Sequence, residues 1–554
     1  MKKAHLILIL IISSVRFLTG QSLIPDDVLE IKAGIEDQVQ KSTFDDNGNI
    51  YLAGIFKNNS LIIGNYILNN KGDNDIFLIK LNSEMQLVFA KSYRNSNFAK
   101  VTDLNVDKDE IVYLTGLFND SIEFDNNTLI SPFGELSFRN STFLAKVSIE
   151  GDILWTKSYD GDSWSSSIIV DSNNNIYLSC SFYINIEFSN LQKTLQHDES
   201  KRNFFLKLNS NGIEIWVKQF GGKLLIDNAQ NIYMLGSYSD SIYFGDIVLK
   251  TISDRENHNI YVAKSDTNGH VFWAKKFCDN EHALLTNVLI DKSAGTILMS
   301  GTYKTDSLTF DDIKIGNNGA ADIFIAKIDT SAHVLMAKTF GGERADYAWG
   351  LSKINKLYTA IVGSCNSDSI ILGDYVIYKD TSDYSRSFFI FIIDSYGNPV
   401  WAKSFPKSSG QVLRTIISDG IQNTYVIGDF NTNSSSKKSA SIFDKPTYIE
   451  QPSIYLIKFK EEGGNEVITK ISPTTSSNIF NVFPNPVSSI LNISTDNKTI
   501  NFDIKIFNIE GKMILQKSLT KANNLINVES LSKGIYFLQM KTTEEIFVEK
   551  VIKK

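Results

Sequence analysis

A unit of about sixty residues recurs along most of this chain, and its repetition limits the folds that are open to the chain. The clearest copy runs from Ser165 to Gly222, where the runs SSIIVD and NIYLS are separated by three asparagines. Asparagine tolerates the positive φ values of tight turns, so this pair of runs is predicted to form a β-hairpin. Two further runs, NFFLKLN and IEIWVKQF, are joined through Ser210, Asn211 and Gly212. One unit is therefore predicted to hold four strands, with a longer insertion between the second and the third.

Two independent positions of the unit give the same number of copies. The second strand ends in a small residue, at intervals of 56 to 65 residues: Gly54, Gly116, Cys180, Gly236, Gly301, Gly363 and Gly428. The third strand carries a lysine in six copies and Ile392 in the other, the lysines being Lys80, Lys146, Lys207, Lys264, Lys327 and Lys458. Both positions predict seven units. We interpret the recurring lysines as solvated positions of these strands.

A single four-stranded sheet cannot cover its own apolar faces, so each unit must stack on its neighbours. Repeats of this kind that stack radially form a β-propeller, and residues 21–470 are predicted to be a seven-bladed one. Ahead of the first complete unit, residues 28–34 (VLEIKAG) read like a fourth strand. We expect this segment to close the ring by completing the last blade. The competing segment for that role is residues 466–471 (EVITKI).

Two short motifs in the repeats are similar to those of a known family. The first is D-x-x-(G/N)-N-I-Y-(L/V)-x-G, found around Asp46 to Tyr51, and the second is D-I-F-(I/L)-(A/I)-K, found at Asp322 to Lys327. Both resemble the bacterial β-propeller repeats often labelled SBBP. The resemblance covers most of the chain and implies the propeller fold. It implies little about function, because propeller repeats host many binding tasks.

The N-terminal residues and the overall charge indicate an exported protein. Residues 1–20 begin with a methionine and two lysines, continue through an apolar run and reach small residues, which predicts a secretory signal peptide. No other apolar run approaches the ~20 residues of a membrane span, so no transmembrane segment is expected in the mature chain. The formal net charge of −7 offers no basic face for nucleic acid. Buried free thiols are favoured over a cross-blade disulfide for the three cysteines, which are Cys180, Cys278 and Cys365.

The repeat period stops near residue 471. Residues 471–477 include the polar run SPTTSS, which is predicted to be a linker. Residues 478–554 contain alternating or apolar runs separated by turns, and this pattern predicts a small antiparallel β-sandwich of the immunoglobulin-like type. The strands expected in it are residues 490–493, 502–507, 513–515, 535–540 and 546–552. The whole chain is thus predicted to be all-β.

The same C-terminal residues carry an ordered series of motifs, VFPNP, LNI, IFNIEGK, LSKGIY and VEKVIKK. The series resembles the type A C-terminal sorting domain of the type IX secretion system of Bacteroidota. The resemblance implies recognition by the secretion machinery, export across the inner and outer membranes, and release or attachment at the outer cell surface. The alternative is a fibronectin-like or carbohydrate-binding sandwich. The residues carried over from the family's motifs are Pro484, Asn485, Pro486, Gly511, Gly534 and Tyr536.

The repeats show little sign of a catalytic or metal site. The six histidines lack metal-binding spacing, and neither a G-x-S-x-G nucleophile motif nor a phosphate-binding loop is present. His270 and His333 share one turn position in adjacent units and are expected to be exposed. The acidic turns at residues 45–49 and 73–75 offer oxygen ligands for calcium without the full spaced loop. We therefore expect no cofactor and no enzyme, the alternative being a secreted hydrolase or lyase with acidic residues at the propeller centre.

A binding site is predicted on the loops that lead from one unit into the next. In a propeller these loops share a face with the insertions between the second and third strands. An exposed aromatic ring beside acids and hydroxyls is typical of sugar or peptide sites, the alternative being tryptophans packed between blades. The sequence thus predicts a non-catalytic binding or structural module, with an extracellular glycan or protein as its candidate partner. The candidate contact residues are Asp162, Trp164, Asp346, Tyr347 and Trp349.

Overall fold

The computed structural model shows an all-β protein that divides into two compact units, Met1–Gly464 and Asn465–Lys554. The predicted signal peptide, the predicted linker, the competing closing segment at 466–471 and Gly511 lie outside the residues that the structure describes. The described residues are 22–134, 138–198, 202–251, 258–278, 282–373, 375–379, 387–405, 411–419, 423–430, 439–442, 445–448, 452–462, 480–495, 502–508, 513–519, 523–541 and 546–554.

Each repeat of the first unit forms an antiparallel sheet of four strands, as the sequence predicts. From the first to the fourth strand, three sheets are β2 (Gln38–Phe44), β3 (Ile50–Phe56), β6 (Asp75–Leu81), β7 (Leu87–Asn95); β8 (Ala99–Val106), β9 (Val112–Phe118), β12 (Ser141–Val147), β13 (Ile153–Tyr159); and β14 (Ser163–Val170), β15 (Ile176–Phe182), β18 (Asn203–Leu208), β19 (Glu214–Lys218). The next are β20 (Lys223–Ile226), β21 (Ile232–Tyr238), β24 (Asn259–Ser265), β25 (Val271–Phe277); β26 (Ala283–Asp291), β27 (Thr296–Tyr303), β30 (Asp322–Asp329), β31 (Val334–Phe340); and β32 (Asp346–Lys353), β33 (Thr359–Cys365), β36 (Ser387–Ile393), β37 (Pro399–Phe405). The last is β38 (Gln411–Ser418), β39 (Thr424–Phe430), β42 (Ser453–Glu462) and β1 (Ser22–Lys32).

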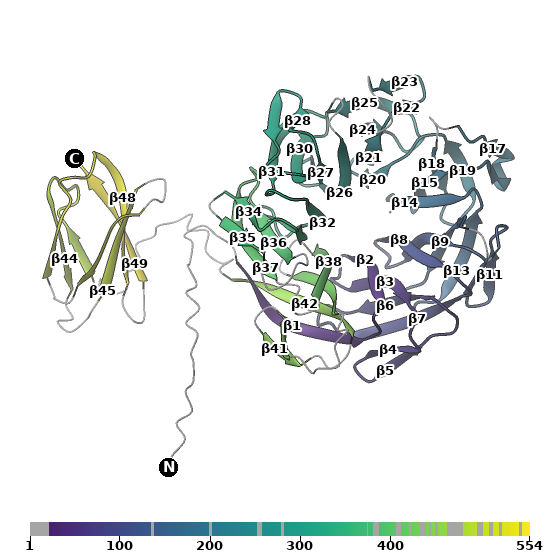
Figure 1. Ribbon diagram of the computed structural model, residues 1–554, viewed down its shortest axis with the longest axis horizontal. Helices are drawn as coiled ribbons and strands as arrows, with labels where there is room; N and C mark the ends of the chain where they lie inside the picture. Colours follow the sequence, from purple (N-terminus) through teal and green to yellow (C-terminus); the bar gives the residue numbers. More distant parts are fainter. Residues whose placement is uncertain are drawn as a thin grey trace, which may run out of the picture. The chain divides into compact units, whose positions relative to one another are not determined.

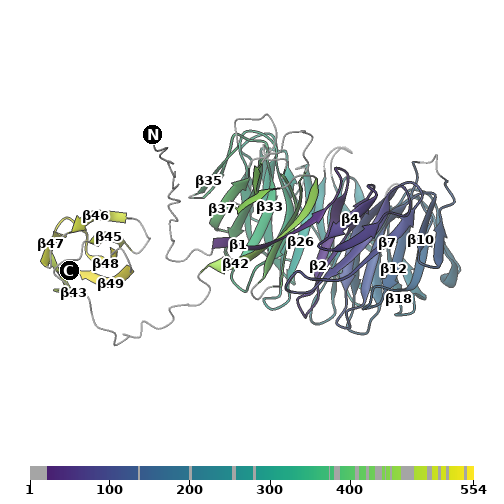
Figure 2. The ribbon, with the colours of Figure 1, turned by 90° about the horizontal axis from the view of Figure 1, so that it is seen from below.

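The sheets of the first unit stand around a common centre in a propeller-like ring (Figure 1). The first strand of each repeat lies nearest the centre, and Figure 2 shows the same sheets from the side. Buried aliphatic and aromatic side chains of adjacent sheets form shared clusters, for example Tyr233 and Leu235 of β21 with Ile297 and Met299 of β27. Stacking on neighbours therefore covers the apolar faces that no single sheet could cover.

The ring closes through the N-terminal strand. Strand β1 pairs antiparallel with β42 from Ser22 opposite Glu462 to Lys32 opposite Ser453. This confirms the prediction that the segment beginning at Val28 completes the last sheet, and β1 starts six residues earlier than the sequence pattern indicated. Ile31 is fully buried, in one cluster with Leu456 of the last sheet and Leu52 of the first. The two ends of the repeat array are thus joined by main-chain hydrogen bonds and by a common core.

The insertion between the second and third strands folds into a two-stranded hairpin, which the sequence reading left as a loop. The hairpin β4–β5 pairs with β1, and β10–β11 pairs with β7, so each of these extends the sheet of the preceding repeat. This pairing covers a fourth strand whose edge would otherwise be open. The hairpins are β4 (Ser60–Ile63) with β5 (Tyr66–Asn69), β10 (Ser121–Phe124) with β11 (Asn127–Ile130), β16 (Ile186–Phe188) with β17 (Lys193–Leu195), β22 (Ser241–Phe244) with β23 (Ile247–Lys250), β28 (Ser307–Phe310) with β29 (Ile313–Gly316), β34 (Ser369–Leu372) with β35 (Tyr375–Tyr378), and β40 (Ser439–Ile442) with β41 (Lys445–Tyr448). A short 3-10 turn, η1 (Ser189–Leu191), joins β16 to β17.

The D-x-x-x-N-I-Y motif is a turn held together by one carboxylate. Asp171 accepts hydrogen bonds from the backbone N–H groups of Asn173 and Asn175, at 2.9 and 2.8 Å. It also accepts from the Asn175 side-chain amide and from the Tyr177 hydroxyl, each at 2.9 Å. The same arrangement recurs at Asp45 and Asp227. The motif therefore sets both the turn and the position of a buried tyrosine.

The recurring lysines of the third strand are not solvated positions, as the sequence was interpreted, because Lys80 and Lys207 are buried and the other four are half-buried. Lys207 is 8 % exposed, and its ammonium lies 5.2 Å from the centroid of the Tyr177 ring. It donates a hydrogen bond of 2.9 Å to the carbonyl oxygen of Thr267, in the turn of the next repeat. Lys458 makes the equivalent bond of 3.0 Å to Ser83, from the last sheet to the first. A lysine stem can bury its methylene groups while its ammonium reaches an acceptor, and here the acceptor belongs to the neighbouring sheet.

Gly54, the small residue near the end of the second strand of the first repeat, lies in close contact with the first strand. A Cβ atom added at Gly54 would lie 2.0 Å from the carbonyl oxygen of Gln38 on β2, just before the bulge between Val39 and Lys41. Such a contact is impossible without moving the backbone. Cys180, which replaces glycine in the third repeat, is fully buried, and none of the three cysteines forms a disulfide. The prediction of buried free thiols is confirmed.

The second unit consists of two antiparallel sheets that share one core, in agreement with the predicted small sandwich. Leu491, Ile504 and Leu538 are fully buried in that core. The sequence pattern missed two strands, β43 and β47. The strands are β43 (Phe480–Phe483), β44 (Ile490–Thr495) and β47 (Asn523–Asn527) in one sheet, and β46 (Met513–Leu519), β45 (Phe502–Asn508), β48 (Gly534–Lys541) and β49 (Ile546–Lys553) in the other.

Candidate functional site

The predicted aromatic residues of the sixth repeat form a stacked pair of a half-buried tyrosine and an exposed tryptophan. Tyr347 and Trp349 lie in β32, with ring centroids 5.7 Å apart and ring planes inclined by 26°. Trp349 is the extra residue of a β-bulge between Ala348 and Gly350, and 42 % of its surface is exposed. The sequence reading placed these residues in a loop. The structure instead places them in the first strand of the sheet, which is a rigid support for a flat apolar surface.

Asp346 anchors this pair and is not itself available to a ligand. It is fully buried and accepts hydrogen bonds from the backbone N–H groups of Gly342 and Asn366, both at 2.9 Å. It also accepts from the hydroxyl of Ser367 at 2.7 Å. The predicted role of Asp346 as an acid beside the aromatic rings is therefore wrong, because its oxygens are occupied by Gly342, which precedes β32, and by Asn366 and Ser367, which follow β33.

Trp164 is a second exposed aromatic residue, separate from the pair. It is the second residue of β14 and is 47 % exposed, so neither tryptophan is packed between sheets. Asp162 precedes β14 with a φ of 45° and accepts a hydrogen bond of 3.1 Å from the backbone N–H of Asn140. The sheets that begin with β20 and β26 lie between β14 and β32 in the ring. The structure thus does not assemble the five predicted residues into one contiguous site.

The sequence reading named no residues of the cavity at the centre of the ring. Its lining comes mainly from the first strands β2, β8, β14, β20 and β26, and its volume is about 370 Å³. We call five of its polar residues, one from each of these strands, the channel ring: Lys41, Asp103, Ser167, Lys223 and Asn287. Aliphatic residues such as Leu225 and Val288 line the rest. The lining is therefore neither a cluster of acids nor a purely apolar surface.

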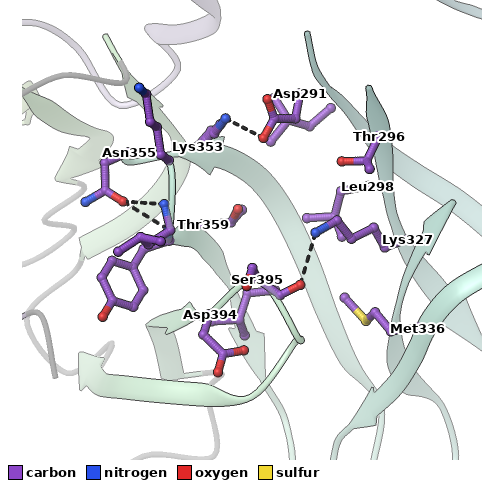
Figure 3. Close-up of a pocket in the computed structure, with 15 residues that line it drawn as sticks. Asp291, Thr296, Leu298, Lys327, Met336, Lys353, Asn355, Thr359, Asp394 and Ser395 are labelled. Atoms are coloured by element: carbon purple, nitrogen blue, oxygen red, sulfur yellow. Dashed lines mark hydrogen bonds and ion pairs between the residues drawn. The ribbon is translucent and has the colours of Figure 1, made fainter. Parts of the chain in front are cut away.

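A second pocket lies between the fifth and sixth sheets (Figure 3). Leu298, in its lining, stands where five of the repeats have a buried tyrosine. Lys327 still donates a hydrogen bond of 3.0 Å to the carbonyl oxygen of Ser395. Asp291 and Lys353 form an ion pair. Burial raises the pKa of Asp291, but the hydrogen bonds from Lys353 and neighbouring groups outweigh it and lower the pKa to about 2. These polar groups bind one another, so the pocket is a packing gap with little to offer a ligand.

Asp429, in the last sheet, should make stability depend on pH. Its side chain is 2 % exposed and hydrogen-bonded to Arg414. Burial raises its pKa to about 6, the Arg414 guanidinium opposes this rise, and the negative charge of Asp37 adds to it. Because the folded-state pKa exceeds the ordinary value of 3.8, the free energy of unfolding should fall as the pH rises from about 4 to about 6. Asp429→Asn should remove this fall, which amounts to about 3 kcal/mol at most. Urea unfolding of both proteins at pH 4.5, 6.0 and 7.5 measures the difference. An unchanged pH slope in the variant would contradict the assignment.

Histidine and carboxylate groups do not assemble a metal site in the described part of the chain, where no cluster of three candidate ligands occurs. His270 and His333 are exposed turn residues, as predicted. In each of the two acidic turns considered for calcium, one carboxylate is bonded within the protein. Asp45 accepts from Asn47 and Asn49, and Asp75 accepts from the hydroxyl of Ser92 at 2.8 Å.

The sorting-motif residues lie beside the last strand of the second unit. Asn485, between the exposed Pro484 and Pro486, accepts a hydrogen bond of 2.9 Å from the backbone N–H of Ile552 through its side-chain oxygen. The hydroxyl of Tyr536 donates to the carbonyl oxygen of Ser532 at 2.9 Å, close to the turn at Gly534. The motif therefore combines an exposed proline-bounded segment with the C-terminal strand it supports.

Residues 481–554 match the secretion system C-terminal sorting domain. This domain addresses the protein to the type IX secretion machinery, and so to export to the cell surface or the surroundings. No helix in the described part of the chain has the length and apolar character needed to cross a membrane. No curated protein matches the chain in sequence.

Comparison with solved structures returns distant similarities. One is a protein of unknown function from Bacteroides caccae, with 8 % identity, a TM-score of 0.32 and coverage of 66 % of this chain and 98 % of that one. Another is the Pan2 WD40 domain of Neurospora crassa, with 9 % identity, a TM-score of 0.37 and coverage of 76 % of this chain and 89 % of that one. A third is PorZ of Porphyromonas gingivalis, a surface component of the type IX secretion system, with 10 % identity, a TM-score of 0.15 and coverage of 95 % and 100 %. Similarities at this level say nothing about what this chain binds.

Proposed function

We propose that this exported protein is a seven-bladed β-propeller that binds an extracellular glycan without catalysis, followed by an immunoglobulin-like sorting domain. The sheet order supports the blade number, because each four-stranded sheet of the first unit corresponds to one repeat and β1 completes the last. The two-sheet core of the second unit supports the sandwich. A secretory signal at residues 1–20 would deliver the chain to the secretion machinery.

The stacked Tyr347–Trp349 pair, with its exposed tryptophan, is the observation on which the proposed binding depends. The apolar face of a sugar ring packs on aromatic rings, and a half-exposed tryptophan supplies that contact without first having to unfold or rotate. Asp346 fixes the start of β32, so the pair is held in place before the ligand arrives. A protein ligand that inserts an apolar side chain is the other partner such a surface could accept.

Trp349→Ala should weaken glycan binding at least tenfold, since it removes most of the exposed ring surface of the pair. A glycan array with the purified protein identifies a bound sugar, and calorimetry with that sugar gives the dissociation constants of both proteins. Tyr396→Ala is the matched control, because Tyr396 is 75 % exposed but lies in the turn between β36 and β37, away from β32. Equal glycan binding by Trp349→Ala and the unchanged protein would contradict the proposal that this aromatic pair is the binding site.

A hydrolase or lyase with acids at the ring centre remains the second candidate. The described lining of the central cavity contributes one acid, Asp103, whose two oxygens accept hydrogen bonds from the backbone N–H groups of Leu104 and Ile168. Hydrolysis of glycosidic bonds generally uses two carboxyl groups that face each other across the substrate. This lining therefore favours binding as the proposal.

A further inference from the structure

We propose that the central cavity of the first unit binds a small oxyanion, such as a carboxylate, between Lys41 and Lys223. The proposal is independent of the Tyr347–Trp349 pair, which belongs to a different sheet. It follows from the register of the first strands, from the charge of the lining and from the bonds that its polar groups already make.

The channel ring lies at one level of the cavity. Lys41 pairs with Ala53, Asp103 with Thr115 and Lys223 with Leu235, and each of these partners directly precedes the glycine that ends a second strand. Ser167 and Asn287 occupy the same register. In all but the strand of Lys223, a β-bulge directly precedes the ring residue.

The shared register explains why distant residues meet, and in every strand of the channel ring but that of Lys223 a bulge contributes to it. A bulge rotates the strand beyond it, and the same rotation at the same place in neighbouring strands turns equivalent side chains toward one cavity. Two lysines from different sheets, 182 positions apart by their numbers, thus line one space. In the first strands of the sixth and seventh repeats, β32 and β38, the equivalent positions are Gly350 and Thr415.

The lining carries an excess of positive charge. Its charged side chains are Lys41, Lys223, Lys292 and Asp103, which gives a balance of +2 in a protein whose formal net charge is −7. Burial, and next the ammonium group of Lys41, lower the pKa of Lys223, while Asp103 opposes this. The two lysines therefore repel each other across a partly dehydrated space, and an anion between them would relieve that repulsion.

The lining does not supply this anion itself. Asp103 is held by the N–H groups of Leu104 and Ile168, at 3.0 and 2.8 Å, and no ion pair among the described residues joins it to either lysine. Asn287 donates its side-chain amide to Thr286 and to the carbonyl oxygen of Ala348, at 3.1 and 3.4 Å. Neither the Lys41 nor the Lys223 ammonium group donates to another described residue, and together with a neutral polar wall they suit a carboxylate, phosphate or sulfate. The cavity volume is within the range of sites for sugar-sized ligands.

Thermal unfolding and calorimetry of the purified full chain with acetate, glucuronate, phosphate or sulfate test the proposal. We expect saturable binding of at least one of these anions, weakened by added salt, and the ranking of the four tells a carboxylate site from a phosphate or sulfate site. Lys41→Met with Lys223→Met should weaken the binding at least tenfold while leaving the protein folded, since it removes like-charge repulsion. Lys218→Met, an exposed lysine on β19, changes the charge in the same sense without touching the cavity and should bind as the unchanged protein does. Absence of saturable binding by all four anions, or equal binding by the double variant, would overturn the proposal.

Discussion

A chain that lacks residues 22–32 should lose the cooperative unfolding transition of the first unit and form aggregates. Without β1, the backbone groups of β42 that now pair from Ser453 to Glu462 become an open edge. The buried cluster that joins the last and first sheets also loses Ile31. Circular dichroism during thermal unfolding, with size-exclusion chromatography, measures the effect. A chain lacking residues 481–554 is the control, and its first unit should unfold as in the full protein.

A point variant separates the role of β1 in the core from the effect of shortening the chain. Ile31→Ala should lower the free energy of unfolding by about 2–5 kcal/mol, because it leaves a cavity at a fully buried position. Ile35→Ala, just beyond the strand, concerns a side chain that is 49 % exposed and should change stability by less than about 0.5 kcal/mol. A stable monomer from the shortened chain, or equal effects of the two variants, would show that the ring does not depend on its N-terminal closure.

Asp171→Ala should destabilise the first unit by about 3 kcal/mol, since it removes the acceptor of several hydrogen bonds at a site that is 5 % exposed. The loss reaches the core, because the Tyr177 hydroxyl keeps only its longer bond, 3.2 Å, to Thr267. Asp394→Ala tests the same turn geometry at an exposed site. Asp394 accepts from the N–H groups of Tyr396 and Asn398, and from the Asn398 amide, without a buried tyrosine.

Urea unfolding followed by tryptophan fluorescence compares the two aspartate variants. We expect Asp394→Ala to cost about 1 kcal/mol, which is the ordinary range for exposed turn hydrogen bonds. The difference between the two losses then measures how much the buried Asp171–Tyr177 hydrogen bond adds to the free energy of unfolding. Equal losses would mean that the turn alone, and not its bond to the buried tyrosine, accounts for the repeated motif.

The third-strand lysines and the insertion hairpins show where the sequence reading failed. A lysine that recurs at a strand position looks the same in the sequence whether water or a neighbouring carbonyl accepts its hydrogen bonds. The environment of Lys207 depends on the next sheet, because a turn of that sheet places the carbonyl oxygen of Thr267 2.9 Å from the Lys207 ammonium. Likewise, hairpin strands of three or four residues give too short an alternation to be told from a loop.

The sequence identified two exposed tryptophans as candidate binding residues, but it did not predict how the five candidate binding residues are arranged in space. The off-register tryptophans are exposed, as a binding surface requires, because they depart from the pattern that packs other tryptophans against the next repeat. Asp346 lies directly beside Tyr347 in sequence, yet it points into a network with Ser367 that no local pattern reveals. The channel ring was missed entirely, because its members are about sixty residues apart in sequence and none of them is unusual in its own repeat.

The sequence by itself determined the four-stranded unit, its repetition, the segment that closes the ring and the address carried by residues 481–554. These follow from local periodicity, from turn chemistry and from motifs read in order along the chain. Only the tertiary structure decided which polar side chains are buried and which meet in the central cavity. The reason is physical. Ring closure and the bulges of the first strands bring together backbone edges and charged groups that are far apart in the sequence, so no local sequence pattern indicates that they meet.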